Sequence, residues 1–131
     1  MSCYGKNVFL SYAGPDQQHA DRLAFICKSR WPRDISDVFS APKSIAPASR
    51  WEKALLVLLR KSDVVMVLWT NKSQFSYGQI VEIGAAWAME KEIVVVVKDV
   101  KESALPFILR SKQAIRWGEF ISRFSEWIKG R

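Results

Sequence analysis

One acidic residue, Glu82, has the sequence position that a reactive carboxylate would need. It falls in the first turns of a helix predicted over residues 78–90. The packed stripe of that helix is predicted to contain Ile80, Ile83, Gly84 and Trp87. Glu82 would then lie at the edge of the stripe, near a cleft, where a carboxylate can stabilise positive charge developing on a substrate. The alternative is a solvated glutamate that the helix dipole favours near an N-terminus.

Other catalytic arrangements lack the residues they need. His19 is the only histidine, so the sequence supports neither a Ser-His-Asp nor a Cys-His nucleophile, and we expect this histidine at the surface. Cys3 and Cys27 form no CxxC motif and cannot complete a zinc site with one histidine, so no metal is expected. Cys27 is predicted to be a small core residue. Neither a GxGxxG nor a GxxxxGKS/T motif occurs, which argues against a dehydrogenase and a P-loop enzyme.

Length and composition indicate one globular domain. The chain has 131 residues, and its hydrophobic fraction of 49% is too high for a disordered protein. The formal net charge of +7 raises the question of nucleic-acid binding. Because the basic residues are scattered, nucleic acid is not expected as a partner. No apolar run is long enough to span a membrane and no signal-peptide segment precedes Asn7, so we expect a cytoplasmic protein without membrane contact.

Short apolar runs alternate with helical patterns, which is typical of a parallel α/β sheet. Strands are predicted over residues 8–10, 35–39, 64–69, 93–97 and 113–117. Helices are predicted over residues 16–29, from about 49, over 78–90, around 107–110 and near the C-terminus at 120–128. This order predicts a flavodoxin-like three-layer sandwich in which helices flank a five-stranded parallel sheet.

Ligands of such sheets bind beyond the carboxyl ends of the strands, near the point where strand order reverses. The loops that would line this edge cover residues 11–16, 40–49 and 70–77. Asp16 is expected to cap the first helix. Ser49 is expected to cap the second helix, and Glu52 completes a capping-box pattern.

Four segments resemble Toll/interleukin-1 receptor (TIR) domains, in the family's order and spacing. These are residues 8–13 followed by Asp16, residues 37–49 followed by Trp51, residues 62–69 followed by Ser73 and Ser76, and residues 76–86. The second segment is similar to the family's BB loop and the helix after it. The fourth is similar to the helix that carries the family's glutamate, which is Glu82 here. The resemblance therefore implies a single TIR domain over residues 1–131.

Many bacterial TIR domains cleave NAD+ between nicotinamide and ribose, so the resemblance implies an NAD+ glycohydrolase with Glu82 as its catalytic residue. NAD+ would be the substrate, and no cofactor is expected. The positively charged pyridinium leaves without protonation. One carboxylate close to the ribose can therefore suffice, where ordinary glycosidases need two. The product could be linear or cyclic ADP-ribose.

The resemblance also implies substrate-binding residues: Ser11, Tyr12, Lys43, Arg50, Trp51, Ser76 and Tyr77. The first two would line the pocket, and the two cations would contact the phosphates of the dinucleotide. Simpler explanations exist for several of them. Tyr12 can be a buried aromatic with a paired hydroxyl, Trp51 a core residue and Ser76 the start of a helix. A solvated positive face would explain both cations.

The sequence departs from the family at one position. Enzymatic members often carry tryptophan four residues before the glutamate, on the same helical face. That position is Gly78 here, although Tyr77 or Phe75 could supply an aromatic ring. The departure puts the geometry of the nicotinamide site in question and leaves the carboxylate in place.

The family's pocket is completed by a loop of a neighbouring domain, so the resemblance implies a homo-oligomer assembled through residues 40–49. A fused or associated sensor domain would drive this assembly in bacterial anti-phage defence. Two alternatives remain. One is a TIR scaffold without turnover, which Gly78 favours. The other is an enzyme similar to nucleoside deoxyribosyltransferases, whose helix motif resembles residues 82–85.

Overall fold

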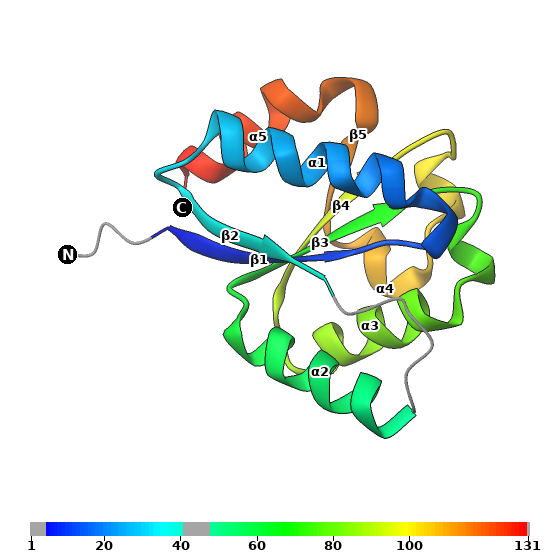
Figure 1. Ribbon diagram of the computed structural model, residues 1–131. Helices are drawn as coiled ribbons and strands as arrows, with labels where there is room; N and C mark the ends of the chain where they lie inside the picture. The colour runs from blue at the N-terminus through cyan, green and yellow to red at the C-terminus, as the bar shows by residue number, and fades with distance from the viewer. Residues whose placement is uncertain (1–4, 41–47, 131) are drawn as a thin grey trace.

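The computed structural model describes residues 5–40 and 48–130, with the backbone alone for residues 48–50. Its centre is a sheet of five parallel strands in the order β2-β1-β3-β4-β5 (Figure 1). The strands are β1 (Lys6–Ser11), β2 (Ile35–Phe39), β3 (Val64–Trp69), β4 (Glu92–Val97) and β5 (Gln113–Arg116). β3 and β4 are almost continuously apolar because helices cover both faces of the sheet.

Helices form the two outer layers. One face is covered by α1 (Gln17–Arg30) and α5 (Phe120–Lys129), and the other by α2 (Ala48–Lys61), α3 (Tyr77–Ala88) and α4 (Phe107–Arg110) (Figure 1). Single 3-10 turns are η1 (Gly14–Asp16), η2 (Ser73–Phe75), η3 (Glu102–Ala104) and η4 (Trp117–Glu119). The predicted flavodoxin-like fold is confirmed. None of the helices within the described ranges has the length and apolar character needed to cross a bilayer.

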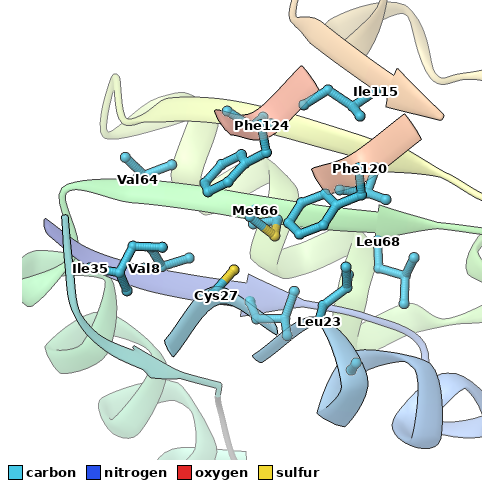
Figure 2. Packing of buried hydrophobic residues seen from close by; sticks show 14 of the residues in the cluster. Val8, Leu23, Cys27, Ile35, Val64, Met66, Leu68, Ile115, Phe120 and Phe124 are labelled. Carbon is cyan, nitrogen blue, oxygen red and sulfur yellow. The ribbon is translucent and has the colours of Figure 1, made fainter. Parts of the chain in front are cut away.

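The core beneath α1 and α5 is apolar and rich in aromatic rings. Phe124 is central to it, with ring centroids 5.0 Å from Trp31 and 5.0 Å from Phe120. Figure 2 shows Cys27 facing Val8 and Met66 in this layer, as expected for a core cysteine. Burial raises the pKa of the Cys27 thiol to about 12, so the thiol remains protonated at neutral pH.

The core beneath α2, α3 and α4 contains the alternate residues of the same strands. Phe9, Val65 and Val67 face this side, whereas their neighbours face α1 and α5. This alternation follows from the two-residue period of a strand. It also directs Ser11 toward α3, because Ser11 lies two residues after Phe9 in β1.

The predicted inward face of α3 is wrong in part: Ile83 is buried as predicted, but two of the other residues face outward. Ile80 is 49% exposed and Trp87 is 53% exposed. The face that meets the sheet contains Gln79, Glu82, Ile83 and Ala86. The hydropathy pattern predicts the wrong inward face for this helix, because two of its buried residues are polar and several of its apolar residues face outward.

α2 begins two residues earlier than an N-cap at Ser49 would require. The helix begins at Ala48, so Ser49 lies inside its first turn and is not its N-cap. Leu55 and Leu59 of this helix are buried, and Trp51 is partly buried against the same core.

Candidate functional site

The strand order reverses beside β1, which pairs with β2 on one side and β3 on the other. Ser11 ends β1 and pairs with Val67 of β3. After β3 the chain passes through η2 and enters α3, whose N-cap is Ser76. The Ser76 hydroxyl accepts a hydrogen bond from the backbone N–H of Gln79 at 3.2 Å, which supports its interpretation as a helix cap. This edge of the sheet is where α/β proteins bind ligands.

Ser11 and Glu82 meet at this reversal point. The Ser11 hydroxyl donates to Glu82 Oε1 at 2.7 Å, and both residues have no exposed surface. A carboxylate at this depth needs polar partners to offset its desolvation. Glu82 is therefore part of a buried polar cluster and not the edge residue that its sequence position suggested.

Gln79 completes the cluster and was missed in the sequence analysis. It lies three residues before Glu82 on the same buried face of α3. Its Nε2 donates to the backbone oxygens of Leu68 at 2.8 Å and Ser11 at 3.2 Å, which joins the ends of β3 and β1. The available signal was its spacing of three from Glu82, which places two polar residues on one helical face.

A second set of hydrogen-bonded polar residues joins the loops after β1 and β3. Thr70 donates from its hydroxyl to Asp16 Oδ2 at 2.6 Å, and its backbone N–H donates to the Ser73 hydroxyl at 2.9 Å. Asp16 occupies the N-cap position of α1 but its side chain makes no capping hydrogen bond there. The expected capping role of Asp16 is therefore wrong, and its carboxylate instead fixes the loop after β3 to the loop after β1.

Tyr12 faces the opposite side of the sheet from Ser11. It lines a cavity of about 140 Å³ with Asp21 and Ser40, at the carboxyl ends of β1 and β2. Burial raises the pKa of the Tyr12 phenol, and the charges of Asp21 and Glu82 act in the same direction, against a hydrogen bond with Ser40. Tyr12 thus lies within electrostatic range of Glu82 although the two side chains belong to different layers.

The aromatic ring beside Gly78 belongs to Trp51 of α2. A methyl group added at Gly78 would lie 3.9 Å from Cζ2 of the indole. Tyr77 is 86% exposed and Phe75 is 82% exposed, so neither of these rings is buried beside the helix. Lys43 lies outside the described residues, as does the side chain of Arg50.

A larger cavity, of about 400 Å³, opens at the carboxyl ends of β4 and β5. Its lining includes Trp117 and the charged residues Lys98, Asp99, Glu102 and Arg116. His19, expected at the surface, is half-buried and packs edge-on against Trp117, with ring centroids 5.4 Å apart. Within residues 5–40 and 48–130, no group of three or more potential metal ligands is gathered in one place.

Comparisons with known proteins agree with this architecture. The family model described as TIR domain matches residues 8–128. No curated protein sequence matches the chain. The TIR domain of the Toll-related receptor TRR-2 from Hydra magnipapillata has a TM-score of 0.72 at 12% identity, covering 93% of this chain and 97% of that one. The Clostridium botulinum CMP N-glycosidase BcmB has a TM-score of 0.67 at 19% identity, covering 93% and 99%. At these identities the two structures show a shared fold.

Proposed function

Because the chain belongs to the TIR-domain family, we propose that it cleaves the bond between nicotinamide and ribose in NAD+, with Glu82 as the catalytic carboxylate. One observation carries the proposal. Glu82 is a fully buried carboxylate at the reversal point of the sheet, and the Ser11 hydroxyl orients it at 2.7 Å. Buried carboxylates are rare unless they are paired or functional, and this one lies where α/β proteins bind ligands.

The proposed reaction needs one carboxylate. The bond between ribose C1′ and the pyridinium nitrogen breaks, and its electron pair neutralises nicotinamide as it leaves. Positive charge then develops on the ribose ring, where Glu82 stabilises it. Water adds at C1′ and loses one proton, which gives ADP-ribose. Ser11 is the positioning residue in this scheme, since its hydroxyl fixes one oxygen of the carboxylate.

Access to Glu82 requires a conformational change, because its side chain has no exposed surface. TIR domains commonly self-associate, and we propose that assembly opens the site. An apolar surface on the outer side of α3 supports this part of the proposal. It contains Tyr77, Ile80, Val81 and Trp87, all exposed. Exposed apolar patches of this kind mark interaction sites.

The remaining features of the proposal follow from the family. Residues 40–49 would complete the pocket of a neighbouring copy, although residues 41–47 lie outside the described part of the chain. Lys43 and Arg50 would contact the phosphates, and Trp51 would provide the aromatic surface that Gly78 lacks. A fused or associated sensor domain would trigger assembly in bacterial anti-phage defence in the cytoplasm.

A second candidate is cleavage of the N-glycosidic bond in a nucleoside monophosphate. The supporting observation is the likeness to a CMP N-glycosidase along nearly the whole length of both chains. The two candidates differ in the leaving group. A pyrimidine leaves as an anion unless an acid protonates it, whereas nicotinamide leaves as a neutral molecule. Glu82 acting as a carboxylate needs no accompanying acid when nicotinamide is the leaving group, and this favours NAD+.

The test is nicotinamide release from NAD+ by purified protein, clustered on a vesicle or a multivalent scaffold. We expect Glu82→Gln to lower kcat by at least about a hundredfold. Glu126→Gln, an exposed substitution on α5, is the matched control and should leave kcat unchanged. CMP is assayed in parallel. If clustered wild type consumes neither nucleotide, a scaffold without turnover explains the fold better.

A further inference from the structure

Gln79 is held in one orientation by the two strands that flank the reversal point. Its Nε2 donates to the Leu68 oxygen in β3 and to the Ser11 oxygen at the end of β1. Turning the amide over would place its oxygen against two carbonyl oxygens, which repel it. The geometry therefore assigns Nε2 to the strands and directs Oε1 away from them.

The other end of this amide has no partner. Gln79 Oε1 is buried, and it accepts no hydrogen bond from any described group. A buried acceptor that lacks a donor costs free energy, and such atoms are rare in folded proteins. An unsatisfied atom one helical turn from a buried carboxylate indicates that a donor is supplied when the site is occupied.

We infer that Gln79 Oε1 accepts a hydrogen bond from the 2′-hydroxyl of the substrate ribose, so that Gln79 selects ribosides over deoxyribosides. The inference rests on the proposed cleavage at Glu82. Residues three apart on a helix are neighbours, about 5–6 Å apart at Cβ. A carboxylate that faces C1′ places its neighbour close to C2′, the adjacent ring carbon, where the hydroxyl is a donor.

The acceptor character of Gln79 Oε1 limits which ligand groups can pair with it. An acceptor oxygen repels phosphate and gains nothing from an apolar ring, so the occupant must present an O–H or N–H. NAD+ offers three such groups near the reacting bond, the 2′- and 3′-hydroxyls of the ribose and the carboxamide of nicotinamide, and the 2′-hydroxyl is the one on the carbon next to C1′. A site built for a hydroxyl rejects the analogue lacking it, because the acceptor then stays buried and unpaired.

The experiment compares NAD+ with an analogue that lacks the 2′-hydroxyl on the ribose attached to nicotinamide. We expect Gln79→Met to reduce the preference in kcat/KM for NAD+ over the analogue by about 10- to 100-fold. The deoxy compound hydrolyses more readily by itself, but this difference cancels when the kcat/KM ratio of the two compounds in the variant is divided by the same ratio in the wild type. Gln74→Met is the matched control. Gln74 is exposed on η2, and its substitution should leave the ratio unchanged.

Several outcomes would overturn the inference. An unchanged ratio in folded Gln79→Met overturns it while Glu82 chemistry stands. The same conclusion follows if Gln79→Met alters discrimination against the nicotinic acid analogue alone, because Oε1 then serves the carboxamide. If Gln79→Met does not fold, binding to Glu82→Gln protein, which retains Gln79, decides: equal binding of NAD+ and the deoxy analogue overturns the inference. Absence of any NAD+ binding or turnover overturns both proposals.

Discussion

The two faces of the sheet are made by the same strands and bury different chemistry. Leu10 and Ser11 are adjacent in β1 and both are buried, yet Leu10 joins an apolar core and Ser11 joins a polar cluster. Beneath α1 and α5, aromatic rings fill the layer around Phe124 (Figure 2). Beneath α3, Gln79 and Glu82 occupy depths that apolar residues would fill at lower cost in free energy.

Both faces bury apolar residues, and the polar cluster that the proposed reaction needs lies on the face beneath α3. The face beneath α1 and α5 contributes to folding, and Glu82, the carboxylate of the proposed reaction, lies on the other face. The polar face gives up hydrophobic burial for a carboxylate with a fixed orientation. The size of a cavity is a poorer guide to the functional site than the buried polar cluster. The cavity of about 400 Å³ beside β4 and β5 contains an ordinary surface ion pair, Lys98 with Asp99 at 2.8 Å.

The largest expected effect is on the apolar face. Phe124→Ala removes a fully buried ring from the centre of the aromatic cluster. We expect the free energy of unfolding to fall by about 3–5 kcal/mol, measured by chemical denaturation. NAD+ turnover per folded molecule should be retained, because the cluster lies across the sheet from Glu82. Phe25→Ala, at a residue of α1 that is 71% exposed, is the control and should change stability by less than about 0.5 kcal/mol.

The comparison between faces would fail if Phe124→Ala lowered kcat of the folded fraction as strongly as it lowered stability. The two layers would then act as one unit, and burial on the α1 face would contribute to the geometry of the site. Equal losses of stability for the Phe25 and Phe124 substitutions would instead show that the aromatic cluster is not the main packing centre of that face.

A smaller effect should appear at the hydrogen bond between Ser11 and Glu82. Ser11→Ala removes the donor at 2.7 Å and should lower the free energy of unfolding by about 1.5–3 kcal/mol, as for other hydrogen bonds to charged groups. The same substitution in a Glu82→Leu background should cost little, because the hydroxyl has lost its acceptor. We also expect kcat to fall about tenfold, since the carboxylate loses its fixed orientation.

The exposed Ser36 of β2 provides a matched serine, and Ser36→Ala should change neither stability nor kcat. Equal costs of Ser11→Ala in the wild-type and Glu82→Leu backgrounds would show that the pair is not coupled. The polar cluster would then be three independent groups, and the orienting role proposed for Ser11 would be wrong.

The apolar face was also the easier one to predict. β2 and β3 have the predicted bounds. β3 is a continuous apolar run, as expected for a strand buried on both sides, whereas β2 is an edge strand that contains Ser36 and Asp37 and is partly exposed. The face of α3 was wrong for the opposite reason. Gln79 and Glu82 are both hydrogen-bonded to Ser11 at the end of β1. Along the chain, Ser11 lies 68 residues from Gln79 and 71 residues from Glu82. Local hydropathy contains no information about such distant hydrogen bonds, so the sequence predicted Glu82 as a candidate carboxylate but not its buried environment.

The smallest effect concerns Gly78, where the polar face departs from its family. Among the described residues, a methyl group there meets only the Trp51 indole, at an ordinary contact distance of 3.9 Å. Gly78→Ala should therefore raise the free energy of unfolding by about 0.4–1 kcal/mol, because alanine restricts the unfolded chain. If Trp51 supplies the aromatic surface, KM for NAD+ should stay within about twofold. Gly84→Ala is the control in the same helix, because no described atom lies within 4 Å of the added methyl group. A rise in KM with Gly78→Ala alone would mean that the substrate itself occupies the space above Gly78.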